Sequence, residues 1–226
     1  CQQYGENWIY AVYEDDQGTI YYIVDEAATS NVDRPWTMDS YGERSSITNV
    51  VMQDAIKPAH LYGFFKDLRN ATTFEIAKLD TSNATNMQSM FYYCENVESL
   101  DLSTFDTSNV TDMYDMFVSC SGLTSVNVNG FNTSKVTDMT GLFSGSKSLK
   151  SVDLSSFDTL NVTSMWCMFE GCNNLRSVKL GGFDTTKVTS MGYMFRDCGK
   201  LEEVDVSGFN TSSLMDTRSM FYGCTS

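Results

Sequence analysis

The chain has 226 residues, of which 42% are hydrophobic and 13% aromatic, so it is long and apolar enough to fold around a core. Its formal net charge is −14 and its sequence pI is near 4.3, an acidic field that opposes binding to nucleic acid and to anionic membranes. No apolar stretch approaches the roughly 20 residues of a membrane-spanning helix, so we expect contact with a membrane only through an anchor.

Residues 1–49 lack internal repetition and contain two strand-like runs. The runs at 8–13 and 19–24 are rich in aromatic and β-branched side chains, and Asp and Gly lie between them. This pattern predicts a β-hairpin. We expect residues 1–49 to form a hairpin cap that covers the first unit of the array. Cys1 is the position that carries lipid in mature bacterial lipoproteins, although an arbitrary start of the sequence would give the same residue.

From residue 50 onward the chain repeats with a fixed 26-residue period. The clearest marker is a Phe that recurs at this step, at Phe91, Phe117, Phe143, Phe169, Phe195 and Phe221. Such a period predicts stacked structural units. We expect a solenoid of about seven units over residues 50–226, with a degenerate first unit at about 56–82 and a truncated last unit. The array then either continues in a longer chain or is covered at that end by another molecule.

Each unit predicts one strand and one short helix. Residues 175–180 follow the pattern L-x-x-V-x-L, which ends in the period-two alternation of a half-buried strand. In residues 110–117 the apolar positions fall at i, i+3, i+6 and i+7, which is one face of a helix, and Thr111 stands where an N-cap would lie. The predicted fold class is therefore an α/β repeat, with a parallel strand ladder on one side of a solenoid and short helices on the other.

Five of the seven Cys fall on one column of the repeat. They are Cys94, Cys120, Cys172, Cys198 and Cys224, with Ser146 in the remaining place. One Cys per unit does not give the clustered spacing of a metal site, so we interpret the column as buried small side chains. Disulfides between neighbouring units are an alternative, which leaves the redox state open.

The unit SSFDTLNVTSMWCMFEGCNNLRSVKL, residues 155–180, is similar to the repeat of BspA-like bacterial surface proteins, which also occurs on mycoplasmal lipoproteins. The resemblance covers residues 61–226 and rests on the pattern F-[DN]-T-x-x-V-T-x-M-x-x-M-F-x-x-C. It implies a leucine-rich-repeat-like solenoid, secretion to the bacterial cell surface on a lipid or wall anchor, and adhesion or protein binding. It implies no catalytic residues. Here the Cys precedes the strand, so the curvature of ordinary leucine-rich repeats is not carried over.

The residues hold little that predicts catalysis. His60 is the only His, and we expect it in the cap or on the surface rather than as a catalytic base. The turn column Asp106, Asn132, Asp158, Asp184 and Asn210 offers oxygen ligands for calcium, but one carboxylate per unit favours turn capping instead. We expect no enzyme, cofactor or metal. An enzyme would need a non-repeating pocket, and its place would be the junction of residues 25–60 with the first unit.

Two surfaces are candidates for binding, and neither predicts a deep small-molecule pocket. The first, the aromatic set, comprises large rings at otherwise polar positions: Tyr92, Tyr114, Trp166, Tyr193 and Tyr222. The second, the strand-face set, comprises Glu98, Asp101, Lys150, Arg176 and Glu202. Rings of this kind are typical interface anchors, although they could equally pack on neighbouring units. We expect a cell-surface adhesin that binds host-matrix or cell-surface protein, with a glycan as a second candidate. The alternative is a rigid spacer that displays another domain.

Overall fold

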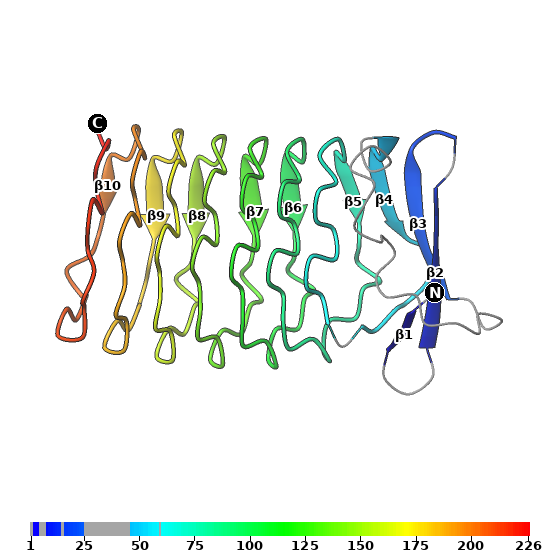
Figure 1. Ribbon diagram of the computed structural model, residues 1–226, viewed down its shortest axis with the longest axis horizontal. Helices are drawn as coiled ribbons and strands as arrows, with labels where there is room; N and C mark the ends of the chain where they lie inside the picture. The colour runs from blue at the N-terminus through cyan, green and yellow to red at the C-terminus, as the bar shows by residue number, and fades with distance from the viewer. Residues whose placement is uncertain (1, 5–7, 15, 25–45, 59) are drawn as a thin grey trace.

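The computed structural model describes residues 2–4, 8–14, 16–24, 46–58 and 60–226. Its coils stack side by side along the long axis of the molecule, with the N-terminal strands at one end and the C-terminus at the other (Figure 1). The expectations for Cys1 and for most of the junction segment, at 25–45, fall outside the described residues.

The strands are short, and most coils contribute one to the same side of the stack (Figure 1). They are β1 Gln2–Tyr4, β2 Trp8–Glu14, β3 Thr19–Val24, β4 Asn49–Met52, β5 Thr73–Glu75, β6 Ser99–Asp101, β7 Ser125–Asn127, β8 Ser151–Asp153, β9 Ser177–Lys179 and β10 Glu203–Val204. Among these strands, sheet hydrogen bonds join β1 through β5 in sequence order, β6 to β7, and β8 through β10. The ladder therefore opens between β5 and β6 and between β7 and β8.

The parallel pairs follow the period of the sequence. Ser99 pairs with Ser125, and Ser151 pairs with Ser177, so each pair is separated by one full repeat. Because a strand alternates its faces, a fixed period places equivalent side chains directly above one another. The predicted solenoid with a parallel strand ladder is therefore confirmed.

The N-terminal strands form part of a larger sheet. Strands β2 and β3 pair antiparallel, with Ala11 opposite Ile23, at the positions where the sequence predicts a hairpin. However, β3 also pairs parallel with β4, and β4 with β5, so the sheet is mixed and continues into the first coils. The prediction of a separate two-stranded hairpin cap is corrected accordingly. The boundary at residue 49 stays a prediction.

The prediction of short helices is wrong. In the described parts of the chain there is no α-helix, and the segment 110–117 consists of turns with isolated parallel bridges from Asp112 to Asn86 and to Asp138. Alternate amides there bond to the next coil, as from Met113 N to Asp138 O (3.2 Å). The amides between them close four-residue turns, as from Met116 N to Met113 O (3.2 Å). These turns reproduce a helical spacing of apolar residues without a helix.

Left-handed backbone explains why no helix forms. Two columns of the repeat have positive φ in every coil from residue 63 to 223. One column runs through Gly63, Ser89, Asp115, Gly141, Cys167, Tyr193 and Ser219, and the other through Asp67, Tyr93, Ser119, Gly145, Gly171, Asp197 and Gly223. A right-handed helix cannot pass through such residues, and Gly adopts this conformation most easily. The recurrence of Gly in both columns is the signal that could have excluded the helices.

The core is a continuous row of Phe rings. Phe117 and Phe143 stack with centroids 5.1 Å apart and planes 3° from parallel, and Phe143 and Phe169 stack at 5.6 Å. All three rings are fully buried. The single interior row that the repeat period predicts is therefore present, and it is the main apolar support of the solenoid.

Candidate functional site

The described residues carry no arrangement typical of metal binding. No group of three or more His, Cys, Asp or Glu among them could hold a metal ion. His60 is exposed, in agreement with the surface position expected for it. The turn column caps its own turns: Asp106 Oδ1 accepts from Ser108 N at 2.9 Å, and Asn132 Oδ1 accepts from Ser134 N at 3.1 Å. These oxygens act as the turn-capping interpretation predicts.

The Cys column satisfies buried main-chain oxygens. Cys120 Sγ lies 3.1 Å from Phe91 O, and Cys172 Sγ lies 3.1 Å from Phe143 O. Ser146 Oγ donates to Phe117 O at 3.0 Å in the same place. The column thus requires a small donor, which Ser and Cys both supply. Burial raises the pKa of the Cys198 thiol to about 12, so it carries almost no thiolate near neutral pH. All column cysteines are free thiols.

The C-terminal half of the aromatic set forms one connected cluster with two arginines. Trp166 and Tyr193 meet edge to face, with centroids 4.9 Å apart. The Arg218 guanidinium lies 5.6 Å from the Trp166 ring centroid, and the Arg196 guanidinium lies 5.0 Å from the Tyr193 centroid and 5.9 Å from the Tyr222 centroid. We call these five residues the ring–arginine cluster. Its cations sit over ring faces, where the ring quadrupole attracts them.

A glycine makes room for the largest ring of this cluster. A Cβ atom on Gly192 would lie only 2.4 Å from the Trp166 ring, so any other residue there would displace the ring from this position. Gly192 occupies the same column of the repeat as Trp166 and Arg218. It lies one coil after Trp166 and one coil before Arg218. The Arg218 side chain therefore reaches Trp166 across the space that Gly192 leaves open.

Acidic side chains pair with both arginines of the cluster. Arg196 Nη1 lies 3.3 Å from Glu170 Oε1, and Arg218 Nη2 lies 2.9 Å from Asp216 Oδ2. Tyr222 is the most accessible ring, with 66% of its surface exposed, while Trp166 and Tyr193 are half-buried. The surface thus offers aromatic faces whose neighbouring charges are largely balanced.

Tyr92 and Tyr114 do not join the ring–arginine cluster. Tyr92 meets Tyr93 edge to face at 4.5 Å, and Lys66 lies 4.8 Å from its centroid. Burial, together with Tyr93, raises the pKa of Tyr92 to about 12. Negative charge on Asp115 raises the pKa of Tyr114. Both tyrosines therefore remain neutral hydroxyls at ordinary pH.

The cationic partners of the rings were missed in the sequence. Neither Arg196 nor Arg218 was predicted as a site residue, although alignment of the repeats places Arg196 directly between Glu170 and Tyr222. Lys66 and Tyr93 beside Tyr92 were also missed. The column alignment was the available signal, because residues one period apart lie on neighbouring coils.

The strand-face set is dispersed along the other side of the solenoid. Within it, Arg176 Nη1 and Glu202 Oε1 form an ion pair at 2.6 Å, and both side chains are about three-fifths exposed. Such exposed pairs contribute little to stability. Glu98 and Lys150 are exposed on their own coils. Asp101 differs from the others, because it borders a cavity.

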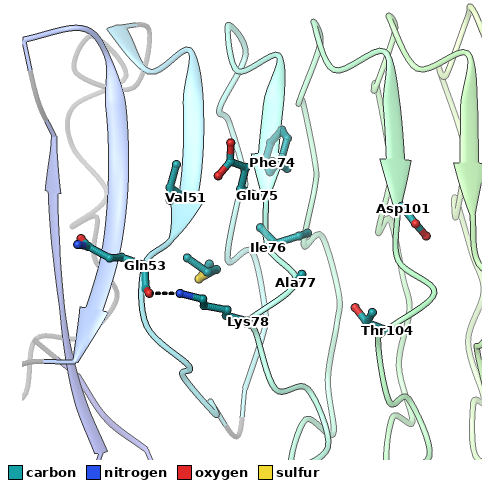
Figure 2. Close-up of a pocket in the computed structure, with 10 residues that line it drawn as sticks. Val51, Gln53, Phe74, Glu75, Ile76, Ala77, Lys78, Asp101 and Thr104 are labelled. Atoms are coloured by element: carbon teal, nitrogen blue, oxygen red, sulfur yellow. Dashed lines mark hydrogen bonds between the residues drawn. The ribbon is translucent and has the colours of Figure 1, made fainter.

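A cavity of about 570 Å³ lies at the first coils, on the strand side. Its lining includes Met52, Phe74, Glu75, Ile76, Lys78 and Asp101 (Figure 2). The sequence places a non-repeating pocket, if any exists, at the junction of residues 25–60 with the first unit. Of the lining residues named above, Met52 belongs to that segment and the rest belong to the coils that follow. The cavity therefore lies beside the expected junction. The sequence did not indicate its depth.

The fold and these surfaces define a class, that of parallel solenoid repeat proteins. The comparison with protein families then places the chain: residues 59–175 and 145–226 match the family described as "Mycoplasma protein of unknown function, DUF285", and the chain belongs to it. This agrees with the mycoplasmal side of the resemblance drawn from the repeat. No curated protein matches the chain. Nowhere in the described segments does a helix reach the length and apolar character needed to cross a membrane.

Proposed function

We propose that this protein is a non-enzymatic binding module of the bacterial cell surface, related to the BspA-like leucine-rich-repeat proteins, and that it adheres to host or neighbouring-cell protein. The observation that carries the proposal is the ring–arginine cluster of Trp166, Tyr193, Arg196, Arg218 and Tyr222. Trp, Tyr and Arg are the residues that dominate binding energy at protein interfaces.

The ring–arginine cluster differs from the repeated core, and this difference supports the proposal. The buried columns of the repeat hold one residue type over many coils, as the Phe row does, whereas the cluster occurs only where Trp166, Gly192 and Arg218 share a column. Stacking of the coils alone does not require this combination, because Thr140 fills the same column one coil before Trp166. A partner that covers Tyr222 and the edges of Trp166 would bury rigid apolar area at a low cost in side-chain entropy.

The test compares the two candidate surfaces in one binding assay. The purified chain would be titrated over immobilised host-matrix proteins and cell-surface glycans, beside two double variants. The first, Arg218→Ala with Tyr222→Ala, removes the accessible half of the cluster. The second, Arg176→Ala with Glu202→Ala, removes an exposed pair from the strand face and serves as a matched control, since it too replaces one arginine.

The proposal predicts that the first variant loses binding at least tenfold and that the second retains it. Loss only in the Arg176 and Glu202 variant would move the site to the strand face. Failure of the wild-type chain to bind any member of the panel would contradict the adhesin proposal. Protease accessibility on intact cells would test the cell-surface location separately.

A rigid spacer is the second candidate function. The observation that favours it is that these side chains already link neighbouring coils: Trp166 contacts Tyr193 of the next coil, and Arg196 contacts Glu170 and Tyr222 on the coils to either side. In that case Trp166→Ala would lower the free energy of unfolding while adhesion of intact cells stayed unchanged.

A further inference from the structure

The strand ladder changes register one coil before it opens. Asn49 of β4 pairs with Thr73 of β5, a step two residues shorter than the full repeat that separates the partners in the β6–β7 pair. In the β6–β7 pair, Leu102 N donates to Asn127 O at 3.0 Å. The equivalent bond across the opening, from Ile76 N to Asp101 O, is not formed. The shorter step, between β4 and β5, therefore lies beside the gap between β5 and β6, although Thr73 and Ser99 across that gap are a full repeat apart.

The cavity at this opening exposes part of the core. Phe74 packs edge to face on Phe65 and Phe91, with centroids 5.5 Å and 5.6 Å away, yet it is only half-buried. Met52 and Ile76 are buried residues that also line the cavity. An apolar floor within about 570 Å³ is in the range of small-molecule sites, which run from roughly 300 to 1,000 Å³.

The charges around this floor are unequal. Lys78 Nζ donates to Gln53 O at 2.6 Å, which directs its ammonium towards the β4 side of the cavity (Figure 2). Glu75 pairs with Val51 through its backbone, but its side chain makes no hydrogen bond or ion pair with the described residues. The Asp101 carboxylate accepts from Ser103 N at 3.1 Å and from Asn127 Nδ2 at 3.0 Å. Two carboxylates and one ammonium, the latter already engaged, thus border the cavity.

Asp101 is held in its charged form. Hydrogen bonds from Ser103, together with one from Asn127, lower the pKa of this carboxyl below its ordinary value. The whole chain adds to the local field, since its net charge is −14. A ligand of opposite charge is therefore favoured over an anion of the same size.

We infer that this cavity is a binding site for a small amphipathic organic cation, an apolar body that carries an ammonium or guanidinium group. The body would lie on Phe74 and Ile76, and the cationic group would lie beside Glu75 or Asp101. The ring of Phe74 adds an attraction for the cation. The site lies on the strand side and involves no residue of the ring–arginine cluster, so it is independent of the proposed adhesion.

The test uses three probes of one shape and different charge. These are 2-phenylethylamine, its neutral counterpart 2-phenylethanol and the anion 3-phenylpropionate, each titrated into the full chain at neutral pH and low salt by calorimetry and by amide chemical shifts. We expect saturable binding of the amine, at least fivefold tighter than that of the alcohol, with shifts at Phe74, Ile76 and Asp101. The anion should bind most weakly.

Charge variants locate the site. Glu75→Gln and Asp101→Asn should each weaken the amine about fivefold, as expected for one partly screened charge pair, and leave the alcohol unchanged. Glu203→Gln removes an equal charge from distant β10 and should have no effect. If Glu203→Gln weakened amine binding equally, the effect would come from the net charge of the chain, and the proposed site would be wrong. Absence of saturable binding of 2-phenylethylamine would overturn the site as well. If a Lys-Phe-Lys peptide bound while 2-phenylethylamine did not, the cavity would belong to a protein partner, and the proposal would also be overturned.

Discussion

At the scale of single residues, the small-donor column shows how one side chain links two coils. The hydroxyl of Ser146 and the thiol of Cys120 perform the same task, since each donates to a buried Phe carbonyl 29 residues earlier. Each carbonyl also accepts from a main-chain amide, as Phe117 O does from Cys120 N, so the column adds a second hydrogen bond and has little preference for sulfur.

Ser146 gives the sharpest test of this role. We expect Ser146→Ala to lower the free energy of unfolding by about 0.5–1.5 kcal/mol, because it removes one of the two hydrogen bonds that Phe117 O accepts in the core; the other, from Cys120 N (3.3 Å), remains. Ser146→Cys restores a donor that five other coils use, so it should cost less than Ser146→Ala. Urea unfolding monitored by circular dichroism measures both. Equal losses in the two variants would show that size, not donation, governs the column.

Asp115 is a second residue whose chemistry follows from its place in the stack. It is half-buried, and its carboxylate lies so close to Gly141 that a Cβ there would be 2.1 Å from Oδ1. Burial, followed by the negative charge of Asp138, raises the pKa of Asp115 from 3.8 to about 6. The folded state therefore holds this proton more tightly than the unfolded state does.

The sign of the resulting pH dependence follows directly. Between pH 4 and 6 the folded state binds a proton at Asp115 that the unfolded state has lost. The contribution of Asp115 to the free energy of unfolding therefore falls as the pH rises through this range. The destabilising effect of Asp115 is complete near pH 7. Asp115→Asn, which keeps a residue that tolerates positive φ, should raise stability at pH 7 and change it little at pH 4. Because solvent screens a half-exposed group, the gain should stay below about 1 kcal/mol. A larger gain at pH 4 than at pH 7 in urea titrations would contradict this assignment.

At the scale of elements, strands and turns differ in how well the sequence predicts them. The strand positions follow from the alternation in residues 175–180, and pairing one repeat apart follows from the period, because both are local or strictly repeated. The prediction of helices was wrong because four-residue turns and helical turns give the same spacing of apolar side chains. Backbone handedness decides between them, and in this chain only the scattered glycines of the two left-handed columns indicate it.

Gly145 tests the importance of that handedness. It has φ +72°, and a Cβ would lie 3.0 Å from Ser119 Oγ, so Gly145→Val places a β-branched residue in left-handed backbone. We expect a loss of about 1–3 kcal/mol in unfolding free energy. Gly182→Val is the matched control, since an added Cβ there meets nothing within 4 Å and the φ angle is not positive; it should cost less than about 1 kcal/mol. Equal costs would show that the left-handed column carries no strain.

At the scale of the whole molecule, the period predicts which residues share a face but not which of them touch. The sequence places Trp166, Tyr193 and Tyr222 on one side of the solenoid, and the structure brings them into contact through Arg196 and Arg218. The link between Trp166 and Arg218 spans two coils and depends on the missing side chain of Gly192. The opening between β5 and β6 lies one coil after the shortened step between β4 and β5, and the period alone predicts neither feature.

The Phe row makes a final prediction about cooperativity. In a solenoid each coil contacts only its neighbours, so the cost of a core substitution depends on how many neighbours the residue has. Phe143 is fully buried and stacks on both Phe117 and Phe169, whereas Phe221 is 43% exposed and stacks on Phe195 alone. We expect Phe143→Ala to cost about 3–5 kcal/mol and Phe221→Ala less than half as much.

Urea unfolding gives the two free energies, and amide hydrogen exchange shows how far the damage extends. Exchange should quicken in the coils of both Phe117 and Phe169 for the central variant, because loss of the middle ring removes an interface on each side. If Phe143→Ala does not fold, Phe143→Leu keeps most of the buried area and allows the same comparison with Phe221→Leu. Equal costs at the two positions, or exchange confined to the substituted coil, would mean that the rings fill space independently and that the stacked row does not couple one coil to the next.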